Sequence, residues 1–172
     1  MDVAWFSLDD HLEGAVDALL RVNGVDPTYP PSTELNRTIE DYTRWLLDTA
    51  TMGRWAALAD GKVAGFIQAT EPHDYIYRSL EKVGYQTQAV NGFCEVGKFF
   101  VDPQFQRQGI GVKLFEQTLA FARICGWEPA VAVPFESTSA MKFVRHMGMR
   151  AAGSFGDDQD LVRVFTKPLQ SM

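Results

Sequence analysis

The chain has 172 residues, enough for a single domain over residues 1–172 with a core that buries about 70% of the unfolded chain's surface. Its formal net charge of −6 and its isoelectric point near 5.0 argue against non-specific binding to nucleic acid or to an anionic membrane surface. No apolar run approaches the roughly 18 residues of a membrane-spanning helix. We therefore expect a cytoplasmic protein without a membrane or nucleic-acid partner.

Two amphipathic helices are predicted in the first part of the chain, and each begins with a capping signal. Ser7 and Asp10 take the N-cap and N3 positions of the first helix. The proline-rich stretch from Asp26 to Ser32 excludes a helix in its interior. Thr38 and Asp41 form a second pair of the same kind, so we expect the second helix to start at about Thr38.

Two strand pairs are predicted from apolar runs flanking short turns. Arg54–Ala59 and Val63–Thr70 are separated by Asp60-Gly61, a pair favoured where both turn residues need a positive φ. Near the end of the chain, Ala151–Phe155 and Leu161–Phe165 are expected to pair around the turn at Gly156-Asp157-Asp158. The order of these elements predicts an α/β domain with a mixed, largely antiparallel sheet.

A long connection from Glu71 to Asn91 follows the hairpin, and its residues Asp74 to Lys82 can form a short helix. Long connections in compact domains are often functional. Three interpretations stay open, namely a solvated loop, a lid over a binding site, and a metal site at His73 and Asp74. Only these two candidate ligands are adjacent and no H-x-x-x-H pattern occurs, so no metal is expected.

The most informative stretch runs from Phe93 to Cys125 and is predicted to be a strand, a loop and a helix. Asp102-Pro103 ends the apolar strand Phe93–Val101, and the loop Gln106–Gly111 precedes a helix with one apolar stripe. Glycines let the backbone approach a ligand, and the free amides at a helix start favour a phosphate. A pyrophosphate is therefore a natural ligand, although two glycines before a helix also fit plain packing and capping.

The loop also carries a family signature. The pattern V-D-P-x-x-Q-x-x-G-x-G after an apolar strand resembles the acetyl-CoA signature of the GNAT superfamily of N-acetyltransferases, with Gln106, Gly109 and Gly111 at its fixed positions. Nucleotide-phosphate enzymes use the same physics at a helix start. Their G-x-G-x-x-G and G-x-x-x-x-G-K-[ST] patterns are absent here, which favours the GNAT resemblance.

A second block resembles the family's N-x-x-A-x-x-x-Y-x-x-x-G-F helix and its exit. It follows at the expected distance, and Ala140 and Gly148 match the pattern. Ser137, Val144 and Met149 replace the usual Asn, Tyr and Phe. By resemblance, Ser137 is expected to keep the helix cap, whereas Val144 has no proton to give where the family's usual general acid stands.

The resemblance implies a GNAT-like domain of about six to seven strands and about four helices, with strands splayed at the acetyl-CoA site. It implies direct, acetyl-CoA-dependent transfer of an acetyl group to a primary amine of a small molecule or peptide. Backbone groups at the end of the central strand would polarise the thioester, and loop amides would hold the pyrophosphate. The cofactor-binding residues so implied are Phe100, Val101, Gln106, Arg107, Gln108, Gly109, Ile110, Gly111, Val112, Ser137, Ala140 and Phe143.

Glu95 is the carboxylate that we expect to act as general base, at a position on the central strand that some family members use for this role. A carboxylate in an apolar strand is unfavourable unless it is paired or functional. The alternatives are pairing with Lys98 or an arginine, exposure to solvent, and binding of a cationic acceptor without proton transfer. Gly97 in the same strand fits a bulge or a close backbone approach.

The family resemblance implies that the region between the first two helices lines the acceptor side, which makes Tyr29, Tyr42 and Trp45 candidates. Tyr75 and Tyr77 of the long connection are the further acceptor candidates. The alternative is that they pack in the core or on its rim. Tyr42, Tyr75, Tyr77 and Tyr85 are also candidate general acids, and a CoA thiolate can leave without a dedicated acid. The acidic composition favours a cationic acceptor such as an aminoglycoside, a polyamine or a basic peptide end.

Two other classes of function compete with the enzyme. A non-catalytic acyl-CoA sensor of the same fold predicts binding without turnover and insensitivity to Glu95→Gln. A nucleotide-phosphate enzyme predicts a preference for ATP over CoA. Homodimers are common among similar proteins, so self-association is a further open expectation.

Overall fold

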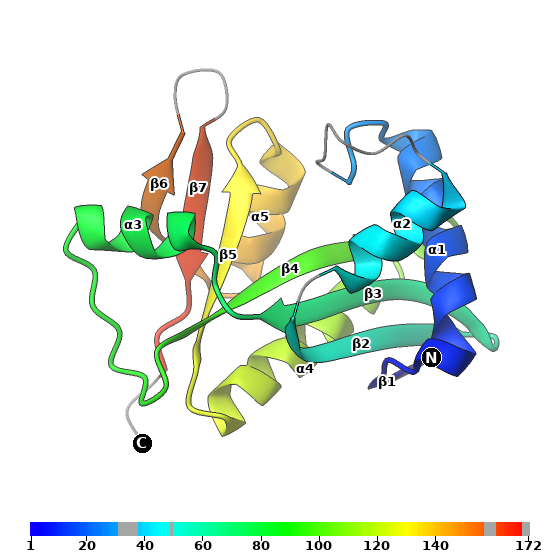
Figure 1. Cartoon of the computed structure of the whole chain (residues 1–172), viewed down its shortest axis with the longest axis horizontal. Coiled ribbons are helices and arrows are strands. Elements are labelled where there is room, and N and C mark those ends of the chain that lie inside the picture. The colour runs from blue at the N-terminus through cyan, green and yellow to red at the C-terminus, as the bar shows by residue number, and fades with distance from the viewer. Residues whose placement is uncertain (31–37, 49, 157–160, 170–172) are drawn as a thin grey trace. The chain divides into compact units, whose positions relative to one another are not determined.

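The computed structural model describes residues 1–30, 38–48, 50–156 and 161–169 (Figure 1). Seven strands of these residues form one sheet in the order β1-β2-β3-β4-β5-β7-β6. The strands are β1 (Asp2–Trp5), β2 (Thr51–Ala59), β3 (Lys62–Thr70), β4 (Phe93–Val101), β5 (Glu128–Pro134), β6 (Arg150–Phe155) and β7 (Val162–Thr166). The helices are α1 (Leu8–Val25), α2 (Ile39–Leu47), α3 (Asp74–Lys82), α4 (Ile110–Ile124) and α5 (Thr138–His146), with a 3-10 turn η1 (Pro103–Phe105).

The sheet is mixed and mostly antiparallel, as the sequence predicts. β5 runs parallel to β4 in a register that sets Ala130 opposite Glu95. β1 pairs antiparallel with β2, and β7 pairs antiparallel with both β5 and β6. The described residues contain five α-helices where about four were expected, because the long connection after β3 contains α3.

The chain divides into two compact units. The first unit comprises Met1–Gln68 and Lys98–Thr118, and the second unit comprises Ala69–Gly97 and Leu119–Met172. The chain passes from one unit to the other within β3, β4 and α4. The loop after β4 therefore belongs to the first unit, and the long connection before β4 belongs to the second.

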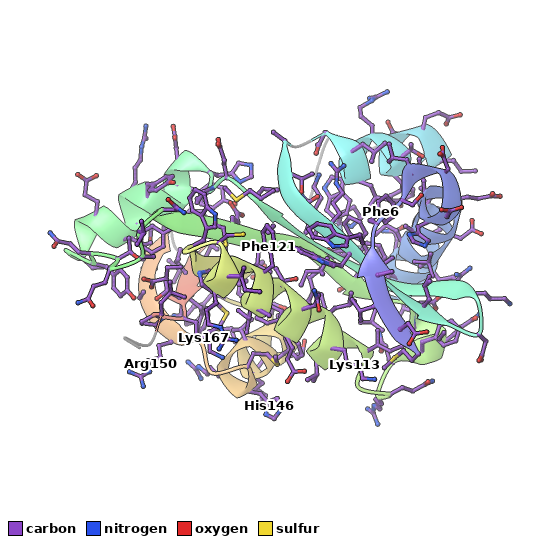
Figure 2. All side chains as sticks on the ribbon, turned by 90° about the horizontal axis from the view of Figure 1, so that it is seen from below. Phe6, Lys113, Phe121, His146, Arg150 and Lys167 are labelled. Carbon is purple, nitrogen blue, oxygen red and sulfur yellow. The ribbon has the colours of Figure 1, made fainter. Side chains whose placement is uncertain are left out.

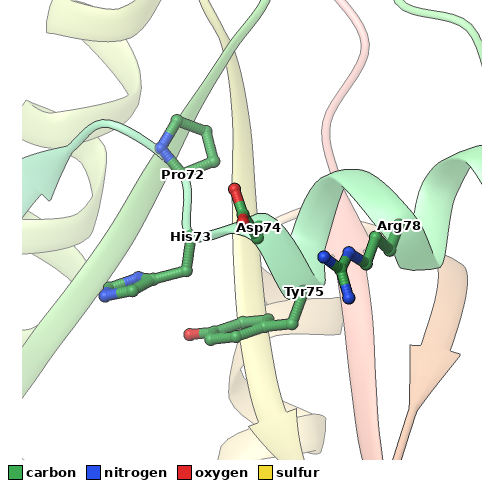
Figure 3. A pocket seen from close by; sticks show the side chains of 5 residues that line it. All are labelled: Pro72, His73, Asp74, Tyr75 and Arg78. Carbon is green, nitrogen blue, oxygen red and sulfur yellow. The ribbon is translucent and has the colours of Figure 1, made fainter.

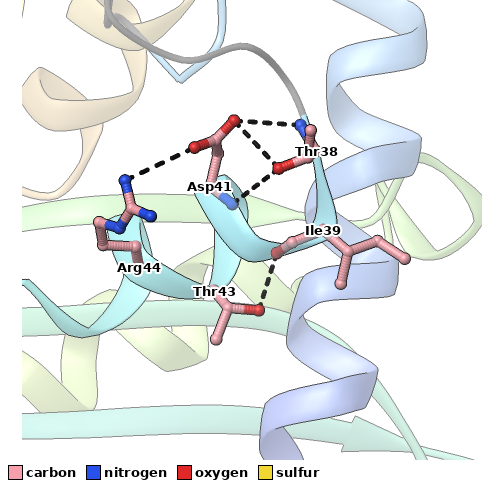
Figure 4. A network of polar contacts seen from close by, with 5 residues as sticks. All are labelled: Thr38, Ile39, Asp41, Thr43 and Arg44. Carbon is pink, nitrogen blue, oxygen red and sulfur yellow. Dashed lines mark hydrogen bonds and ion pairs between the residues drawn. The ribbon is translucent and has the colours of Figure 1, made fainter.

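Both predicted capping signals are formed in the first unit. At α2, the Asp41 N–H donates to Thr38 Oγ1 at 3.2 Å and the Thr38 N–H donates to Asp41 Oδ2 at 3.3 Å, which completes a capping box (Figure 4). Arg44 Nη1 lies 3.7 Å from Asp41 Oδ1. At α1, the Asp10 N–H donates to Ser7 Oγ at 3.3 Å. These bonds satisfy amides that have no partner inside the helix, so the helices begin where they were predicted.

The core of the first unit joins α1 and α2 to β2, β3 and the end of β4. Leu19, Leu46 and Phe66 are fully buried there, and each such side chain contributes about 1.5–3 kcal/mol on burial. Phe100 of β4 stacks on Phe66 with ring centroids 5.7 Å apart. The end of β4 is therefore fixed by its side chains as well as by the sheet.

In the second unit, α3 packs on β6 and β7 (Figure 1). Its residues Ile76 and Leu80 are buried together with Phe93 of β4. A Cβ atom at Gly153 of β6 would stand 2.5 Å from Ser79 Oγ and 2.8 Å from the Ser79 carbonyl oxygen, so this close approach requires glycine. The short helix predicted in the long connection is thus confirmed.

The rest of that connection is held by Glu128 at the start of β5. The Glu128 side chain is buried, and its two oxygens accept from Tyr85 Oη and Thr87 Oγ1, each at 2.6 Å. Tyr85 Oη also accepts from Thr166 Oγ1 of β7 at 3.0 Å. Burial and the bond to Glu128 raise the pKa of Tyr85, so its hydroxyl keeps the proton that it donates.

Some predicted features lie outside the described residues, namely the turn residues Asp157 and Asp158 and the end of the proline-rich stretch, Pro31 and Ser32. Within the described ranges, no helix combines the length and the apolar composition that crossing a membrane requires. The same ranges contain no group of three or more His, Cys, Asp or Glu side chains suited to hold a metal ion.

Candidate active site

Asp102 follows β4 and fixes the start of the glycine-bearing loop. Its side chain is 0% exposed, and Oδ2 accepts from Arg21 Nε of α1 at 2.7 Å. Oδ1 accepts from the Gln104 N–H at 2.9 Å, and the Asp102 N–H donates to the Ala64 carbonyl of β3 at 2.9 Å. A buried carboxylate is stable only with such partners. The loop therefore leaves β4 from a fixed position in the first unit.

The loop reaches α4 through two residues in the left-handed region, Arg107 with φ of 62° and Gly109 with φ of 77°. An added Cβ at Gly109 would meet no atom within 4 Å, so the dihedral angle and not the available space favours glycine here. The Lys113 N–H donates to the Gly109 carbonyl at 3.1 Å. The amides before Lys113 are those that a helix start leaves without an internal partner.

The predicted loop residues gather at one exposed helix start. Residues 106–109 are exposed, residues 111–112 are half-buried, and Ile110 is buried and anchors the first turn. Lys113 projects outward from the same end of α4 (Figure 2). Unpaired amides, the positive end of a helix and two basic side chains fit the pyrophosphate that the family resemblance implies.

The end of β4 differs from the prediction in one detail. The left-handed residue is Lys98, with φ of 46°, whereas φ is not positive at Gly97 and an added Cβ there would meet no atom within 4 Å. Lys98 Nζ donates to the Asp48 side chain and to the Trp45 carbonyl. Burial lowers the pKa of Lys98. The irregularity of the strand is thus held by side-chain bonds and not by the absence of a side chain.

Phe100 and Val101, the residues predicted to face the thioester, are engaged inside the first unit. The Phe100 side chain belongs to the core, and its carbonyl oxygen would stand 2.9 Å from a Cβ on Gly65 of β3. The Val101 carbonyl accepts from Gln106 Nε2 at 3.3 Å. The role predicted for these two residues therefore depends on their backbone alone.

The second predicted block forms α5, but its cap differs from the expectation. Ser137 is the N-cap residue, yet its side chain makes no capping hydrogen bond, so the expected side-chain cap is wrong. Its ψ of 71° departs from the extended conformation of the other serine cap, Ser7, whose ψ is 133°. Ala140 and Phe143 are half-buried, and Val144 is buried.

Glu95 lies in the part of β4 that belongs to the second unit, and it is 7% exposed. Oε2 accepts from the His73 backbone N–H at 3.0 Å and lies 2.7 Å from Nδ1 of the His73 ring. Oε1 accepts from Tyr75 Oη at 2.9 Å. The two donors, with the ring nitrogen beside Oε2, suit a carboxylate that acts as an acceptor. These partners, and not the basic residues considered from the sequence, hold Glu95.

Aromatic stacking keeps these donors in place. The His73 and Tyr75 rings stack with centroids 5.2 Å apart, and Tyr75 stacks on Phe155 of β6 at 4.4 Å. Burial, followed by the charge of Glu95, raises the pKa of Tyr75, so this hydroxyl stays protonated and donates. Burial also raises the pKa of the Cys94 thiol to about 12, which leaves little nucleophilic thiolate at neutral pH.

His73 and Tyr75 line a pocket of about 560 Å³ together with Pro72, Asp74 and Arg78 (Figure 3). This volume lies within the range of roughly 300–1,000 Å³ that is usual for small-molecule sites. In Figure 3 the two stacked rings project from the chain on the same side. The pocket offers an imidazole, a carboxylate and a guanidinium to a ligand.

Two of the tyrosines predicted on the acceptor side pack in the first unit. Tyr42 is 1% exposed, and its hydroxyl has no hydrogen-bond partner among the residues that the structure describes. Tyr29 Oη donates to the Phe99 carbonyl at 3.1 Å, and its ring packs edge-on against Trp45. Tyr77 is exposed on α3. The accessible acceptor candidates are therefore on α3 and beside it.

His73 is the member of this cluster that the sequence did not point to as a proton-transfer group. In the sequence it is a lone histidine at the start of a long connection, and its bond to Glu95 spans 22 positions. The available signal was its place two residues before Tyr75, in a connection rich in polar and aromatic side chains. The structure brings His73, Tyr75 and Glu95 together.

Comparison with protein families identifies the class that this fold and loop define. The sequence model of the acetyltransferase (GNAT) family matches residues 17–149, so the chain belongs to that family. A curated relative, an uncharacterized N-acetyltransferase of Archaeoglobus fulgidus, is 33% identical over 86 residues, which are 50% of this chain and 51% of that protein. The match thus spans about half the length of this relative.

Solved structures agree on the fold. An aminoglycoside 6′-N-acetyltransferase complexed with coenzyme A superposes with a TM-score of 0.68 and 13% identity, over 100% of this chain and 99% of that chain. The ribosomal-protein-S18-alanine N-acetyltransferase of Escherichia coli superposes with a TM-score of 0.65 and 13% identity, over 99% and 95% of the two chains. At these identities the similarity is one of fold.

Proposed function

We propose that this chain is an acetyl-CoA-dependent N-acetyltransferase that moves an acetyl group directly to a primary amine of a small molecule or peptide. The observation that carries the proposal is the exposed start of α4, where Gly109 in the left-handed region follows β4 in the family's signature. Membership of the family and the coenzyme A complex of a structure with the same fold support it. The family match includes residues of both units, which favours one functional domain over residues 1–172.

The cofactor is assigned to the helix start and to α5. The amides of residues 106–112 bind the pyrophosphate, with Arg107 adding charge. The backbone at Phe100 and Val101 polarises the thioester carbonyl, and Ser137, Ala140 and Phe143 contact the cofactor from α5. Because these contacts are mostly made by backbone groups, the loop depends on its dihedral angles more than on its side chains.

General-base catalysis is assigned to Glu95 and the groups bonded to it. An amine must lose a proton as it attacks the thioester, and a buried carboxylate beside a histidine suits this need. A covalent acetyl-cysteine is disfavoured at Cys94, since burial raises the pKa of its thiol to about 12. Direct transfer is therefore the simpler route.

The leaving thiolate has no assigned acid. Val144 stands at the family's usual tyrosine position, and it is buried. Tyr75 is already bonded to Glu95, and burial raises its pKa, so it is a poor donor for the sulfur. We infer that the CoA thiolate leaves with the help of solvent.

The acceptor is assigned to the pocket beside α3. Tyr75 offers an aromatic contact, and Asp74 offers a carboxylate to an ammonium group. The exposed Tyr77 lines a different pocket on α3, so its role in acceptor binding stays a prediction. Arg78 lines the same pocket, so a polycation would meet a like charge there. A primary amine that also carries an anionic or neutral polar group fits both side chains.

The test is a thermal-shift titration with acetyl-CoA, CoA and ATP in parallel, followed by turnover with a panel of amines. A ligand that binds only the folded state stabilises it by about 2.7 kcal/mol at a hundredfold excess over Kd. Shifts with both CoA species but not with ATP, together with CoA release that depends on an amine, are expected. Binding without turnover on any amine would instead favour an acyl-CoA sensor of the same fold.

A further inference from the structure

The carboxylate of Glu95 is poorly placed to meet an acceptor directly. Its side chain is 10% exposed, whereas the side chain of its partner His73 is 55% exposed. Both carboxylate oxygens already have partners, Oε2 in His73 and Oε1 in Tyr75. A ligand in the pocket beside α3 therefore reaches the imidazole more readily than the carboxylate.

The contact between the two side chains also sets the state of the imidazole. Oε2 of Glu95 accepts from the His73 backbone N–H, and the ring Nδ1 lies 2.7 Å from the same oxygen. An ionised carboxylate has no proton to give, so Nδ1 carries the hydrogen in this contact. In the neutral ring, Nε2 is then the nitrogen with the free lone pair.

We propose that Nε2 of His73 takes the proton from the acceptor amine and that Glu95 is the positioning residue that orients the ring and stabilises the imidazolium; this rests on the proposed acetyl transfer. Tyr75 stacks on one face of the ring, and Tyr75 itself stacks on Phe155. Two contacts thus hold the ring, while 55% of the side chain stays exposed. A histidine held in this way presents Nε2 to a ligand in the pocket.

The step balances without a further reactant. The amine nitrogen attacks the thioester carbon, an N–C bond forms, and the C–S bond breaks with its electron pair leaving on the CoA sulfur. One proton passes from the nitrogen to His73 Nε2 and from there to solvent. The thiolate takes a proton from solvent, which gives the amide and CoA.

The kinetic test is the substitution His73→Asn. The Asn side-chain amide can still donate to Glu95 in place of Nδ1, but the variant has no counterpart of Nε2. We expect kcat to fall by roughly 10²–10⁴-fold while KM for acetyl-CoA and the thermal shift with CoA stay unchanged. His146→Asn is the matched control, since His146 is exposed and points outward at the end of α5 (Figure 2). Wild-type kcat in His73→Asn would overturn the proposal.

A second measurement does not depend on turnover. The chain has three histidines, so ¹⁵N-labelled histidine resonances can be assigned by comparison with His73→Asn and His146→Asn. We expect the hydrogen of neutral His73 on Nδ1, and a shift of the tautomer population in Glu95→Gln, because the contact with Oε2 favours the hydrogen on Nδ1. A hydrogen on Nε2 would overturn the proposal. An inactive wild-type protein would instead overturn the acetyl transfer on which it rests.

Discussion

The loop that follows β4 and the carboxylate near the start of β4 are built in different ways. The loop offers amides of consecutive residues, and its shape is fixed by a buried aspartate and by two left-handed dihedral angles. The Glu95 cluster offers side chains, and its members are 20 to 22 positions apart in the sequence. A site made of backbone depends on local conformation, whereas a site made of side chains depends on how distant segments pack.

The two sites should therefore respond differently to amino-acid substitutions. The loop should tolerate many exchanges of its exposed side chains, provided that the left-handed angles and the anchor at Asp102 are kept. The cluster should tolerate none of the exchanges that remove a proton donor or the charge. Variants of the two sites should therefore separate cofactor binding from the chemical step.

The largest effect is expected from Glu95→Gln. The amide keeps the size of the side chain but has no charge to stabilise a protonated His73, so kcat should fall by roughly 10²-fold or more. The thermal shift with acetyl-CoA should stay at the wild-type value, because the loop amides are untouched. Steady-state kinetics with the best amine measures the effect. Glu116→Gln is the control, because Glu116 is an exposed carboxylate on α4. Equal kcat values in the two variants would contradict the assignment of the chemical step to the Glu95 cluster.

The next effect is expected from Arg21→Gln, which removes the charged partner of a fully buried carboxylate. The free energy of unfolding should fall by about 1.5–3 kcal/mol, and the affinity for acetyl-CoA should weaken because the loop loses its anchor. Urea unfolding and the thermal-shift titration measure these two quantities. Arg44→Gln is the matched control, since Arg44 is largely exposed and such a pair contributes roughly 0–1 kcal/mol. A lower kcat with an unchanged affinity for acetyl-CoA in Arg21→Gln would contradict the role of Asp102 as the anchor of the loop.

Gly109→Ala should have a smaller effect of a different origin. There is room for the methyl group, so the change costs only the left-handed dihedral angle, about 1–2 kcal/mol. KM for acetyl-CoA should rise while kcat with saturating cofactor is retained. Gly24→Ala in α1 is the control, because φ is not positive there and no atom lies near the added Cβ. That control should stabilise the protein by about 0.5–1 kcal/mol.

The pH-dependent effect of Cys94→Ala should be absent near neutral pH and appear only at alkaline pH. Burial raises the pKa of the Cys94 thiol from its ordinary value of 9.0 to about 12 in the folded protein. The unfolded chain therefore loses this proton first, and the stability that depends on the protonated thiol is lost as pH rises above 9.0. The free energy of unfolding, measured with urea under reducing conditions, should fall in the wild type relative to Cys94→Ala as pH rises. The difference between the two proteins should change by at most about 1.4 kcal/mol per pH unit. If this difference in the free energy of unfolding did not change with pH, the Cys94 thiol on β4 would be accessible to water.

Local signals explain what the sequence predicted well. The bounds of β4, the start of α4 and the capping box of α2 follow from apolar runs, glycines and side chains within a few residues of each other. The sequence also allowed a short helix over Asp74 to Lys82 in the long connection, and α3 has these bounds. The family signature itself lies in such a local stretch, between Val101 and Gly111.

The rest depends on contacts that no local pattern contains. The bond from Arg21 to Asp102 spans 81 positions, so the anchor of the loop was invisible in the sequence. The same holds for His73, whose partner lies in the next strand along the chain. The capping bond of Ser137 was expected by resemblance, but Ser137 takes the N-cap position with a ψ of 71° and without that bond.

The hydrogen bonds of Glu128 have a consequence for the chain as it is synthesised. Tyr85 precedes Glu128 by 43 positions and Thr166 by 81 positions. At translation rates of about 5–20 residues per second, roughly 4 to 16 seconds pass between the synthesis of Tyr85 and that of Thr166. We expect the connection between α3 and β4 to be accessible to proteases and chaperones during this interval. Ribosome-bound chains stalled before Glu128 should therefore be cut there sooner than chains in which β5 and β7 have emerged.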